Sequence, residues 1–305
     1  MGEPGWVEVQ APAVTLRGLS WEPRDAAAGA PIALCLHGFP DTAHGWRLLA
    51  PRLAAAGWRV VAPFMRGYAP STLAAHGSYH VGAQMDDALR VLDGVGPTGR
   101  DVVIGHDWGA IAASGLAAMP DSPFRRAVVM SVPPSRAFWP RRGHGLRRSL
   151  LALLPAQALR SWYTMYFQLP WLPEHSKSWI LPLLWRRWSP GFDASEDLRH
   201  VDAAIGSPQS WRAALGPYRA TARPGKPPAQ YAELERYWQR PLRLPTLYLH
   251  GADDGCLGVK LADRARTALP PDGAMHVVHR AGHFLQPEQP DVVAGRILDF
   301  IGHAG

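Results

Sequence analysis

The chain has 305 residues, of which 47% are hydrophobic and 19% are charged, and its formal net charge is +7. This composition supports a globular α/β domain with an inserted segment, and it excludes a disordered chain. The positive charge comes almost entirely from arginine, since Lys177, Lys226 and Lys260 are the only lysines. No nucleic-acid-binding motif accompanies that charge, so we expect no nucleic-acid partner.

The two cysteines and the N-terminal segment indicate a reducing compartment. Cys35 and Cys256 stand in separate apolar segments without metal-ligand spacing, which indicates two reduced thiols and no metal site. The first residues, MGEPGWVEVQ, have no apolar signal segment, and no run of about eighteen apolar residues is long enough to cross a membrane. We therefore expect a cytoplasmic protein with no transmembrane segment.

In chain order, short apolar runs alternate with segments of helical spacing. Two short antiparallel strands are predicted at residues 7–9 and 14–16. Buried strands are predicted by the continuous apolar runs at 32–36, 59–63, 102–104 and 127–130. The helices predicted between them cover residues 48–56, 85–92 and 110–118. This order predicts an α/β fold, with a mostly parallel sheet covered by helices on both faces.

The pattern changes between residues 135 and 240, which are rich in Trp, Arg and Leu at helical spacing. Strand patterns resume at 246–250 and 275–278, and a last amphipathic helix is predicted over 292–301. We therefore expect one α/β core, made of residues 1–134 and 241–305. The residues between them, 135–240, are expected to form a helical cap on that core.

Asp107 stands at the centre of Gly105-His106-Asp107-Trp108-Gly109, between a predicted buried strand and a predicted helix. A strand-to-helix elbow of this kind holds its central side chain above the carboxyl edge of the sheet, where open α/β folds bind ligands. An aspartate at that position can attack a carbon atom and form an alkyl ester, which water then hydrolyses. The elbow therefore predicts a carboxylate nucleophile suited to epoxides or alkyl halides.

The expected chain order in this fold is nucleophile, acid and histidine. Asp254 follows the strand predicted over 246–250 and is our choice for the acid, with its neighbour Asp253 as the alternative. His283 follows the next predicted strand, and we expect it to activate water, with the acid orienting its ring.

The loop His37-Gly38-Phe39-Pro40 follows the first buried strand. We expect the backbone N–H groups of Phe39 and Trp108 to form an oxyanion hole beside the nucleophile. His37, Pro40 and Trp108 are also expected to contact the substrate.

Four motifs in the chain resemble those of the α/β-hydrolase-fold epoxide hydrolases. The motifs are His37-Gly38-Phe39-Pro40, Arg66-Gly67-Tyr68-Ala69-Pro70-Ser71, His106-Asp107-Trp108-Gly109 and Gly282-His283-Phe284. The resemblance covers residues 30–134 and 241–302, and it extends more weakly into the insertion, which corresponds to the family's cap. It implies hydrolysis of an epoxide to a vicinal diol without a cofactor, and a cis peptide bond between Phe39 and Pro40.

The same family uses two cap tyrosines that donate hydrogen bonds to the epoxide oxygen. Tyr163 and Tyr218 occupy segments that resemble these positions, and Tyr166 is the alternative to Tyr163 and a further expected substrate contact. Ring opening releases an alkoxide, which is a stronger base than phenolate. A tyrosine with a pKa of about 10 therefore keeps its proton until the alkoxide forms.

Two alternatives to epoxide hydrolysis remain open at this point. A haloalkane dehalogenase would use the same nucleophile and the following Trp108, although Phe39 offers no side-chain donor to a halide. A ligand-binding protein that keeps the fold without catalysis is the second alternative. The aromatic residues of the insertion indicate a small-molecule substrate, a bulky apolar or aromatic epoxide.

Overall fold

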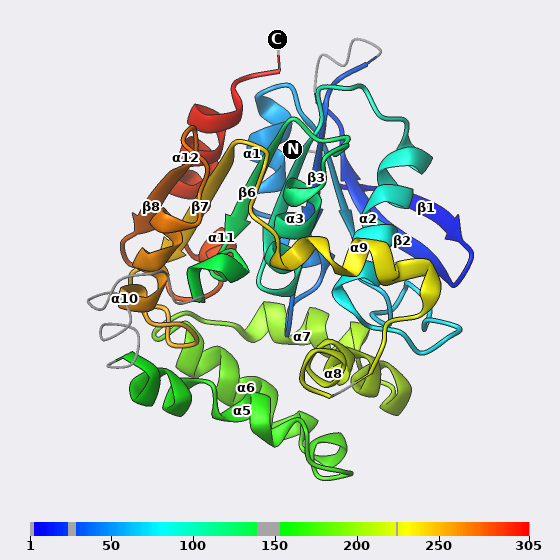
Figure 1. The fold of residues 1–305 in the computed structure, drawn as a ribbon, viewed down its shortest axis with the longest axis vertical. Coiled ribbons are helices and arrows are strands. Elements are labelled where there is room, and N and C mark those ends of the chain that lie inside the picture. Colours follow the sequence, from blue (N-terminus) through cyan, green and yellow to red (C-terminus); the bar gives the residue numbers. More distant parts are fainter. Residues whose placement is uncertain (1–2, 24–28, 139–152, 224, 305) are drawn as a thin grey trace.

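The computed structural model describes residues 3–23, 29–138, 153–223 and 225–304. In this part of the chain, eight strands form one sheet in the order β1-β2-β4-β3-β5-β6-β7-β8 (Figure 1). The strands are β1 (Gly5–Ala11), β2 (Val14–Trp21), β3 (Ile32–Leu36), β4 (Arg59–Pro63), β5 (Val102–His106), β6 (Arg126–Met130), β7 (Thr246–Gly251) and β8 (Ala274–Val278). The pairs β1–β2 and β2–β4 are antiparallel and the others are parallel, which confirms the predicted α/β class.

Helices cover both faces of this sheet. α2 (Val81–Val95) packs beside α3 (Trp108–Ala118) on one face, and α1 (Ala50–Ala55) packs beside α12 (Pro290–Ile301) on the other (Figure 1). Every residue of β3, β5 and β7 is buried, as expected for parallel strands between two helical layers.

The last helix shows how the sequence sets an element's limits. The helix predicted over 292–301 begins two residues earlier, because Pro290 lies in its first turn, where a missing N–H costs no hydrogen bond. It buries Val293 and Ile297 on one face. It ends at Gly302, whose φ of 83° is readily adopted only by glycine.

The insertion is helical and lies over the end of the sheet where Asp107 is found (Figure 1). Its main helices are α5 (Trp162–Tyr166), α6 (Lys177–Trp188), α7 (Ser195–Ala204) and α8 (Pro208–Ala222). No strand occurs among the described residues of 135–240, as the sequence analysis expected.

The last part of the insertion contacts the core. α9 (Ala232–Glu235) packs on α2 of the core, and the Gly82 N–H donates to Glu235 Oε2 at 2.5 Å. A Cβ atom on Gly82 would lie 2.6 Å from the Glu235 nitrogen, so glycine permits this close approach. The segment around α9 is therefore attached to the core, which apolar periodicity alone did not reveal.

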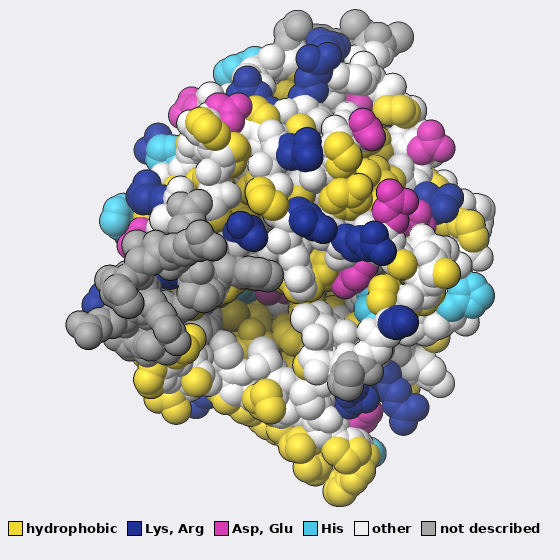
Figure 2. Space-filling view, in the orientation of Figure 1, with side chains coloured by type: hydrophobic (Ala, Val, Ile, Leu, Met, Phe, Trp, Pro, Cys, Tyr) yellow, Lys and Arg dark blue, Asp and Glu magenta, His cyan; other side chains and the backbone are white. Residues whose placement is uncertain are grey.

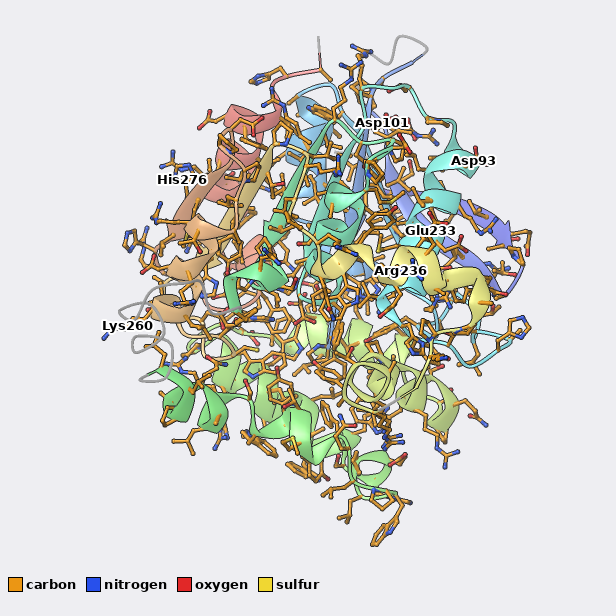
Figure 3. All side chains as sticks on the ribbon, in the orientation of Figure 1. Asp93, Asp101, Glu233, Arg236, Lys260 and His276 are labelled. Carbon is orange, nitrogen blue, oxygen red and sulfur yellow. The ribbon has the colours of Figure 1, made fainter. Side chains whose placement is uncertain are left out.

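The short helices α10 (Val259–Ala262) and α11 (Leu285–Glu288) follow β7 and β8. Charged residues such as Asp93, Glu233 and Lys260 are exposed and lie at the outside of the core (Figure 3). On the face shown in Figure 2, Lys and Arg side chains are interspersed with hydrophobic and acidic ones, and they form no single basic patch among the residues described there. None of the described helices is long and apolar enough to span a bilayer.

Candidate active site

Asp107 lies at the junction of β5 and α3, with φ 53° and ψ −116°. A positive φ is strained for a residue with a side chain. The turn closes because its flanking residues have no Cβ: a Cβ on Gly109 would lie 2.0 Å from the Leu36 carbonyl oxygen, and one on Gly105 would lie 2.1 Å from the Gly109 oxygen. The structure therefore places Asp107 at a tight strand-to-helix turn, where the sequence predicted one.

The loop after β3 supplies one hydrogen bond to this carboxylate. The Phe39 N–H donates to Asp107 Oδ1 at 2.8 Å, and the Phe39–Pro40 peptide bond is cis. A Cβ on Gly38 would lie 2.4 Å from Asp107 Oδ1, so this approach also requires glycine. Among the described residues, the Trp108 N–H makes no corresponding bond to Asp107.

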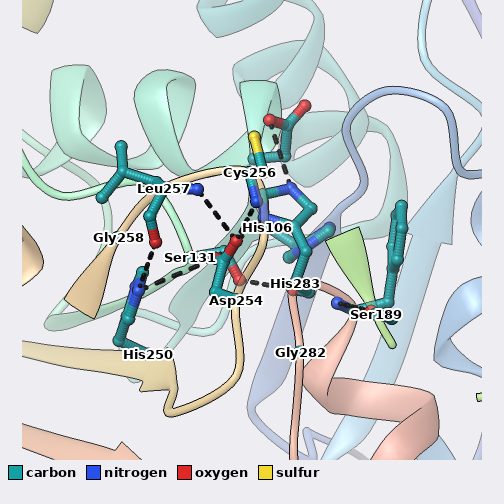
Figure 4. Close-up of polar contacts among 12 residues, drawn as sticks. His106, Ser131, Ser189, His250, Asp254, Cys256, Leu257, Gly258, Gly282 and His283 are labelled. Atoms are coloured by element: carbon teal, nitrogen blue, oxygen red, sulfur yellow. Dashed lines mark hydrogen bonds and ion pairs between the residues drawn. The ribbon is translucent and has the colours of Figure 1, made fainter. Parts of the chain in front are cut away.

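His283 lies between two carboxylates (Figure 4). Its Nδ1–H donates to Asp254 Oδ2 at 3.0 Å, and its Nε2 lies 3.6 Å from Asp107 Oδ2. Asp254 is buried, and its Oδ1 accepts hydrogen bonds from the backbone N–H groups of Cys256 and Leu257, at 2.7 and 2.9 Å. Asp253 is exposed, so the structure brings Asp254 and not its neighbour into this arrangement.

Neighbouring opposite charges keep Asp107 and His283 ionised although both side chains are buried. Burial opposes the charge on Asp107, but His283, whose Nε2 lies 3.6 Å away, holds the pKa of the carboxyl below its usual value. Burial also opposes a charged His283. The two carboxylates outweigh it and raise the pKa of the imidazole to about 10. At neutral pH the free protein therefore holds an ionised Asp107 beside an imidazolium.

Two tyrosines of the cap, Tyr163 on α5 and Tyr218 on α8, are buried with their ring centroids 5.8 Å apart. The ring of Tyr218 packs edge-to-face on Phe39 and on Trp108, at 5.3 and 5.0 Å between centroids. Burial, reinforced by nearby negative charges that include Asp107, raises the pKa of both hydroxyls well above 10. Both hydroxyls are therefore protonated at neutral pH and can act as donors.

The two tyrosine hydroxyls differ in their partners. The Tyr163 hydroxyl lies 3.3 Å from the Cys256 sulfur. The Tyr218 hydroxyl is buried and makes no hydrogen bond of normal geometry among the described residues, and the nearby side chain of Trp108 can act on its oxygen only as a weak donor. A buried hydroxyl without a hydrogen bond lowers the stability of the fold, and such groups are often explained by a catalytic role.

Tyr166, the alternative to Tyr163, lies apart from Tyr163 and Tyr218. Tyr166 packs against Trp179 at 5.9 Å, and its hydroxyl donates to the Leu172 carbonyl at 3.3 Å. The structure therefore does not bring Tyr166 into the Asp107 cluster. The one-turn helix α5 directs its side chain to the outside of the cap, so only Tyr163 remains the first candidate donor.

His37 and Pro40 hold the loop after β3, and His37 also lines a small cavity together with Trp108. His37 is fully buried: its Nε2 accepts from the Met65 N–H and its Nδ1–H donates to the Gly38 carbonyl, both at 2.9 Å. Burial lowers the pKa of His37 to about 4, so it is neutral. Pro40 is buried as well, and its carbonyl accepts the indole N–H of Trp185 at 3.0 Å, which links core to cap.

The sequence analysis missed Cys256 as a member of this cluster. Its sulfur and ligand atoms of Asp254 and His283 lie within 4.8 Å of one another, a grouping able to hold a metal ion. Asp254 and His283 are hydrogen-bonded to each other, so a metal would first have to replace that bond. The only signal in the sequence was the position of this cysteine, two residues after the acid.

Comparison with known proteins agrees with this architecture. The family model of the alpha/beta hydrolase fold matches residues 31–290. The chain is 30% identical to the AB hydrolase superfamily protein YfhM of Bacillus subtilis, over 90% of this chain and 93% of that protein. It is 28% identical to Epoxide hydrolase A of Mycobacterium tuberculosis, over 90% and 91% of the two chains.

Among solved structures, the fold is similar to that of an epoxide hydrolase from an endophytic Streptomyces, with a TM-score of 0.74 and 24% sequence identity. The match covers 99% of this chain and 96% of that one. The chain therefore belongs to the α/β-hydrolase-fold family, and its named relatives include epoxide hydrolases.

Proposed function

We propose that the chain is an epoxide hydrolase that converts an epoxide and water to a vicinal diol. The observation that carries the proposal is the burial of one carboxylate, Asp107, beside His283 on the core and beside Tyr163 and Tyr218 on the cap. The likeness to Epoxide hydrolase A supports it.

In the first half-reaction, an oxygen of Asp107 attacks a ring carbon and the C–O bond of the epoxide breaks. The released oxygen takes a proton from a cap tyrosine, and an alkyl ester remains on Asp107. Tyr218 is the better placed donor in the free protein, because its hydroxyl has no other partner in the described residues.

In the second half-reaction, His283 takes a proton from water as the water attacks the ester carbonyl. The Phe39 N–H stabilises the oxyanion that forms. Collapse breaks the bond to the diol oxygen, which takes the proton that His283 removed from water, and the Asp107 carboxylic acid then gives its proton back to His283. The proton that His283 held in the free enzyme passes to the tyrosinate, so the overall change is epoxide plus water to diol.

Ester formation removes the negative charge 3.6 Å from His283 Nε2. Since that charge helps to raise the pKa of His283, the pKa falls in the intermediate and the imidazole can act as a base.

Halide release is less well supported than ring opening. A halide needs N–H donors, and two of the cap tryptophans have theirs engaged. The indole of Trp185 donates to Pro40 and that of Trp211 donates to Pro173, at 3.0 and 2.8 Å. Two tyrosine hydroxyls beside the nucleophile instead suit an alkoxide leaving group.

The walls of the site indicate the class of substrate. Four aromatic rings lie against the two tyrosine side chains: Phe39, Trp108, Phe167 and Trp188. Such walls bind apolar surface well, so we propose a bulky apolar or aromatic epoxide.

The test is to trap the ester in His283→Gln and to weigh the protein. Without the base, alkylation proceeds and hydrolysis stops, so incubation with aryl epoxides should give the mass of the protein plus the whole epoxide. An alkyl halide would instead add the substrate mass minus HX. Digestion should locate the adduct on the peptide that contains Asp107.

Controls make this result specific. The double variant Asp107→Ala/His283→Gln should form no adduct, and Asp253→Asn should turn over normally because Asp253 is exposed and lies outside the cluster. An adduct from alkyl halides alone would establish a dehalogenase. Binding of either class without an adduct would establish the non-catalytic ligand-binding protein, and absence of both would call for a different substrate.

A further inference from the structure

The C-terminal end of cap helix α6 meets both catalytic loops of the core. The Trp188 carbonyl accepts hydrogen bonds from the His283 N–H at 2.9 Å and from the Gly255 N–H at 3.1 Å. The last carbonyls of a helix have no partner within it, so donors from outside can satisfy them. Here the donors are Gly255, the residue after the acid Asp254, and His283 itself.

The next cap residue, Ser189, holds the two neighbours of His283. Its hydroxyl donates to Glu288 Oε1 at 2.6 Å, and its oxygen accepts from the Phe284 N–H at 3.2 Å. The other oxygen of Glu288 accepts from the Gly282 N–H at 2.7 Å. Figure 4 shows Ser189 and Gly282 beside His283. Ser189 is 1% exposed and Glu288 is partly buried, so these bonds are partly shielded from water.

The end of α6 packs closely against the two core loops. A Cβ on Gly282 would lie 2.5 Å from Ser189 Cα, and one on Gly255 would lie 1.8 Å from the Arg187 oxygen. The ring of Trp188 lies 5.0 Å from that of His283. One turn earlier, Trp185 stacks on Phe284, at 3.5 Å between centroids and 8° between planes.

Core and cap hold opposite ends of the same residue. The His283 carbonyl accepts hydrogen bonds from His106 Nε2–H and Ser131 Oγ–H, which belong to the core. Its N–H is held by Trp188 of the cap. The core therefore holds the carbonyl of His283 and, through Asp254, its ring, while the cap holds the N–H end of the residue.

We propose that Ser189 and Glu288 are positioning residues for His283, through which docking of the cap controls the second half-reaction. This rests on the proposed function. Alkylation depends on Asp107, which the elbow and Phe39 hold, and on the cap tyrosines. Among the described residues, the side chains of Ser189 and Glu288 hydrogen-bond to the histidine loop and to none of these groups. Ester hydrolysis depends on where His283 Nε2 lies, and a displacement of about 1 Å can slow such a step by about a hundredfold.

The experiment measures the two half-reactions separately, by rapid quenching and intact-protein mass, in Ser189→Ala and in the isosteric Glu288→Gln. Ester hydrolysis should slow by about tenfold or more, while the rate of alkylation stays unchanged. The alkyl-enzyme should therefore accumulate at steady state. Ser189→Thr keeps the hydroxyl and should restore much of the hydrolysis rate.

Asp197→Asn is the matched control. Asp197 also joins cap to core, through Arg47 at 2.5 Å, but on α7, and it makes no contact with the histidine loop. Arg47 keeps Glu196 as a partner in this variant, so the cap should stay docked. Both half-reactions should proceed as in the wild type.

Two results would overturn the proposal. One is unchanged ester hydrolysis in both Ser189→Ala and Glu288→Gln. The other is equal slowing of both half-reactions with a lowered Tm, which would indicate loss of stability only. Failure of the proposed function is distinct from either, because His283→Gln would then form no adduct at all.

Discussion

The two cap tyrosines have different environments although they face the same carboxylate. The Tyr163 hydroxyl has the Cys256 sulfur beside it, and the Tyr218 hydroxyl is buried without a partner in the described residues. A buried hydroxyl without a hydrogen bond destabilises a fold by about 1–3 kcal/mol. Tyr218 thus has the features of a residue kept for its chemistry at a cost in stability.

Tyr218→Phe should therefore lose activity without losing stability. We expect its Tm to equal or exceed that of the wild type, because the change removes an unpaired polar atom. Alkylation should slow by roughly tenfold or more, since one of two proton donors is gone. Thermal unfolding and single-turnover alkylation measure the two effects, and a Tm several degrees below that of the wild type would contradict this account.

Tyr163→Phe provides the comparison for Tyr218→Phe. It removes a hydroxyl that is paired with Cys256, so its Tm should not rise. Its alkylation rate should fall less than that of Tyr218→Phe, because substrate has to displace the thiol before this tyrosine can donate. The reverse order of the two rates would make Tyr163 the principal donor.

At the scale of elements, the site depends on how closely β5 and α3 approach the loop after β3. The turn at Asp107 has no room for side chains on Gly105 or Gly109. The same holds at the end of α6, where Gly255 and Gly282 let the cap helix touch two core loops. Backbone contact between elements, rather than side-chain size, sets the positions of the catalytic groups.

Gly109→Ala should destabilise the protein by about 1–3 kcal/mol or more, because the added methyl group meets the Leu36 carbonyl at 2.0 Å. Gly295→Ala is the matched control. Gly295 lies exposed within α12, with nothing within 4 Å of a Cβ, so the change should stabilise the helix by about 0.5–1 kcal/mol. Urea unfolding measures both, and effects of equal sign would contradict the proposed geometry of the elbow.

For the whole molecule, the charge on His283 links stability to pH. Its pKa is about 10 in the folded protein and 6.5 in an unfolded chain. The folded state therefore binds this proton more tightly, and the resulting stability is complete below pH 6.5 and is lost as the pH rises toward 10. The free energy of unfolding should fall over this range, as urea unfolding at a series of pH values would measure.

His283→Gln serves as the reference for that measurement, because it keeps the other titrating groups. Asp41 is one of them: burial raises its pKa to about 8, so its own contribution declines between about pH 4 and pH 8 in both proteins. The difference in unfolding free energy between wild type and variant reports the titration of His283 together with that of Asp107 and Asp254, whose pKa values His283 lowers. A difference that does not change with pH would show that the imidazole is neutral in the folded state.

The sequence by itself determined the α/β class, the helical nature of the insertion and the chain order of Asp107, Asp254 and His283. These follow from local signals, namely apolar runs of strand length, helical spacing, and glycine-containing turns directly after strands. The periodicity of a segment depends on its own residues, so it can be read without knowing what the segment contacts.

Only the tertiary structure decided which side chains meet. It turned Asp254 rather than Asp253 toward His283, placed Tyr163 rather than Tyr166 beside Tyr218, and attached α9 to the core. It also brought Ser189 to Glu288, residues far apart in the chain. Side-chain direction and contact between distant segments depend on how whole elements pack, and no local pattern in the sequence records that packing.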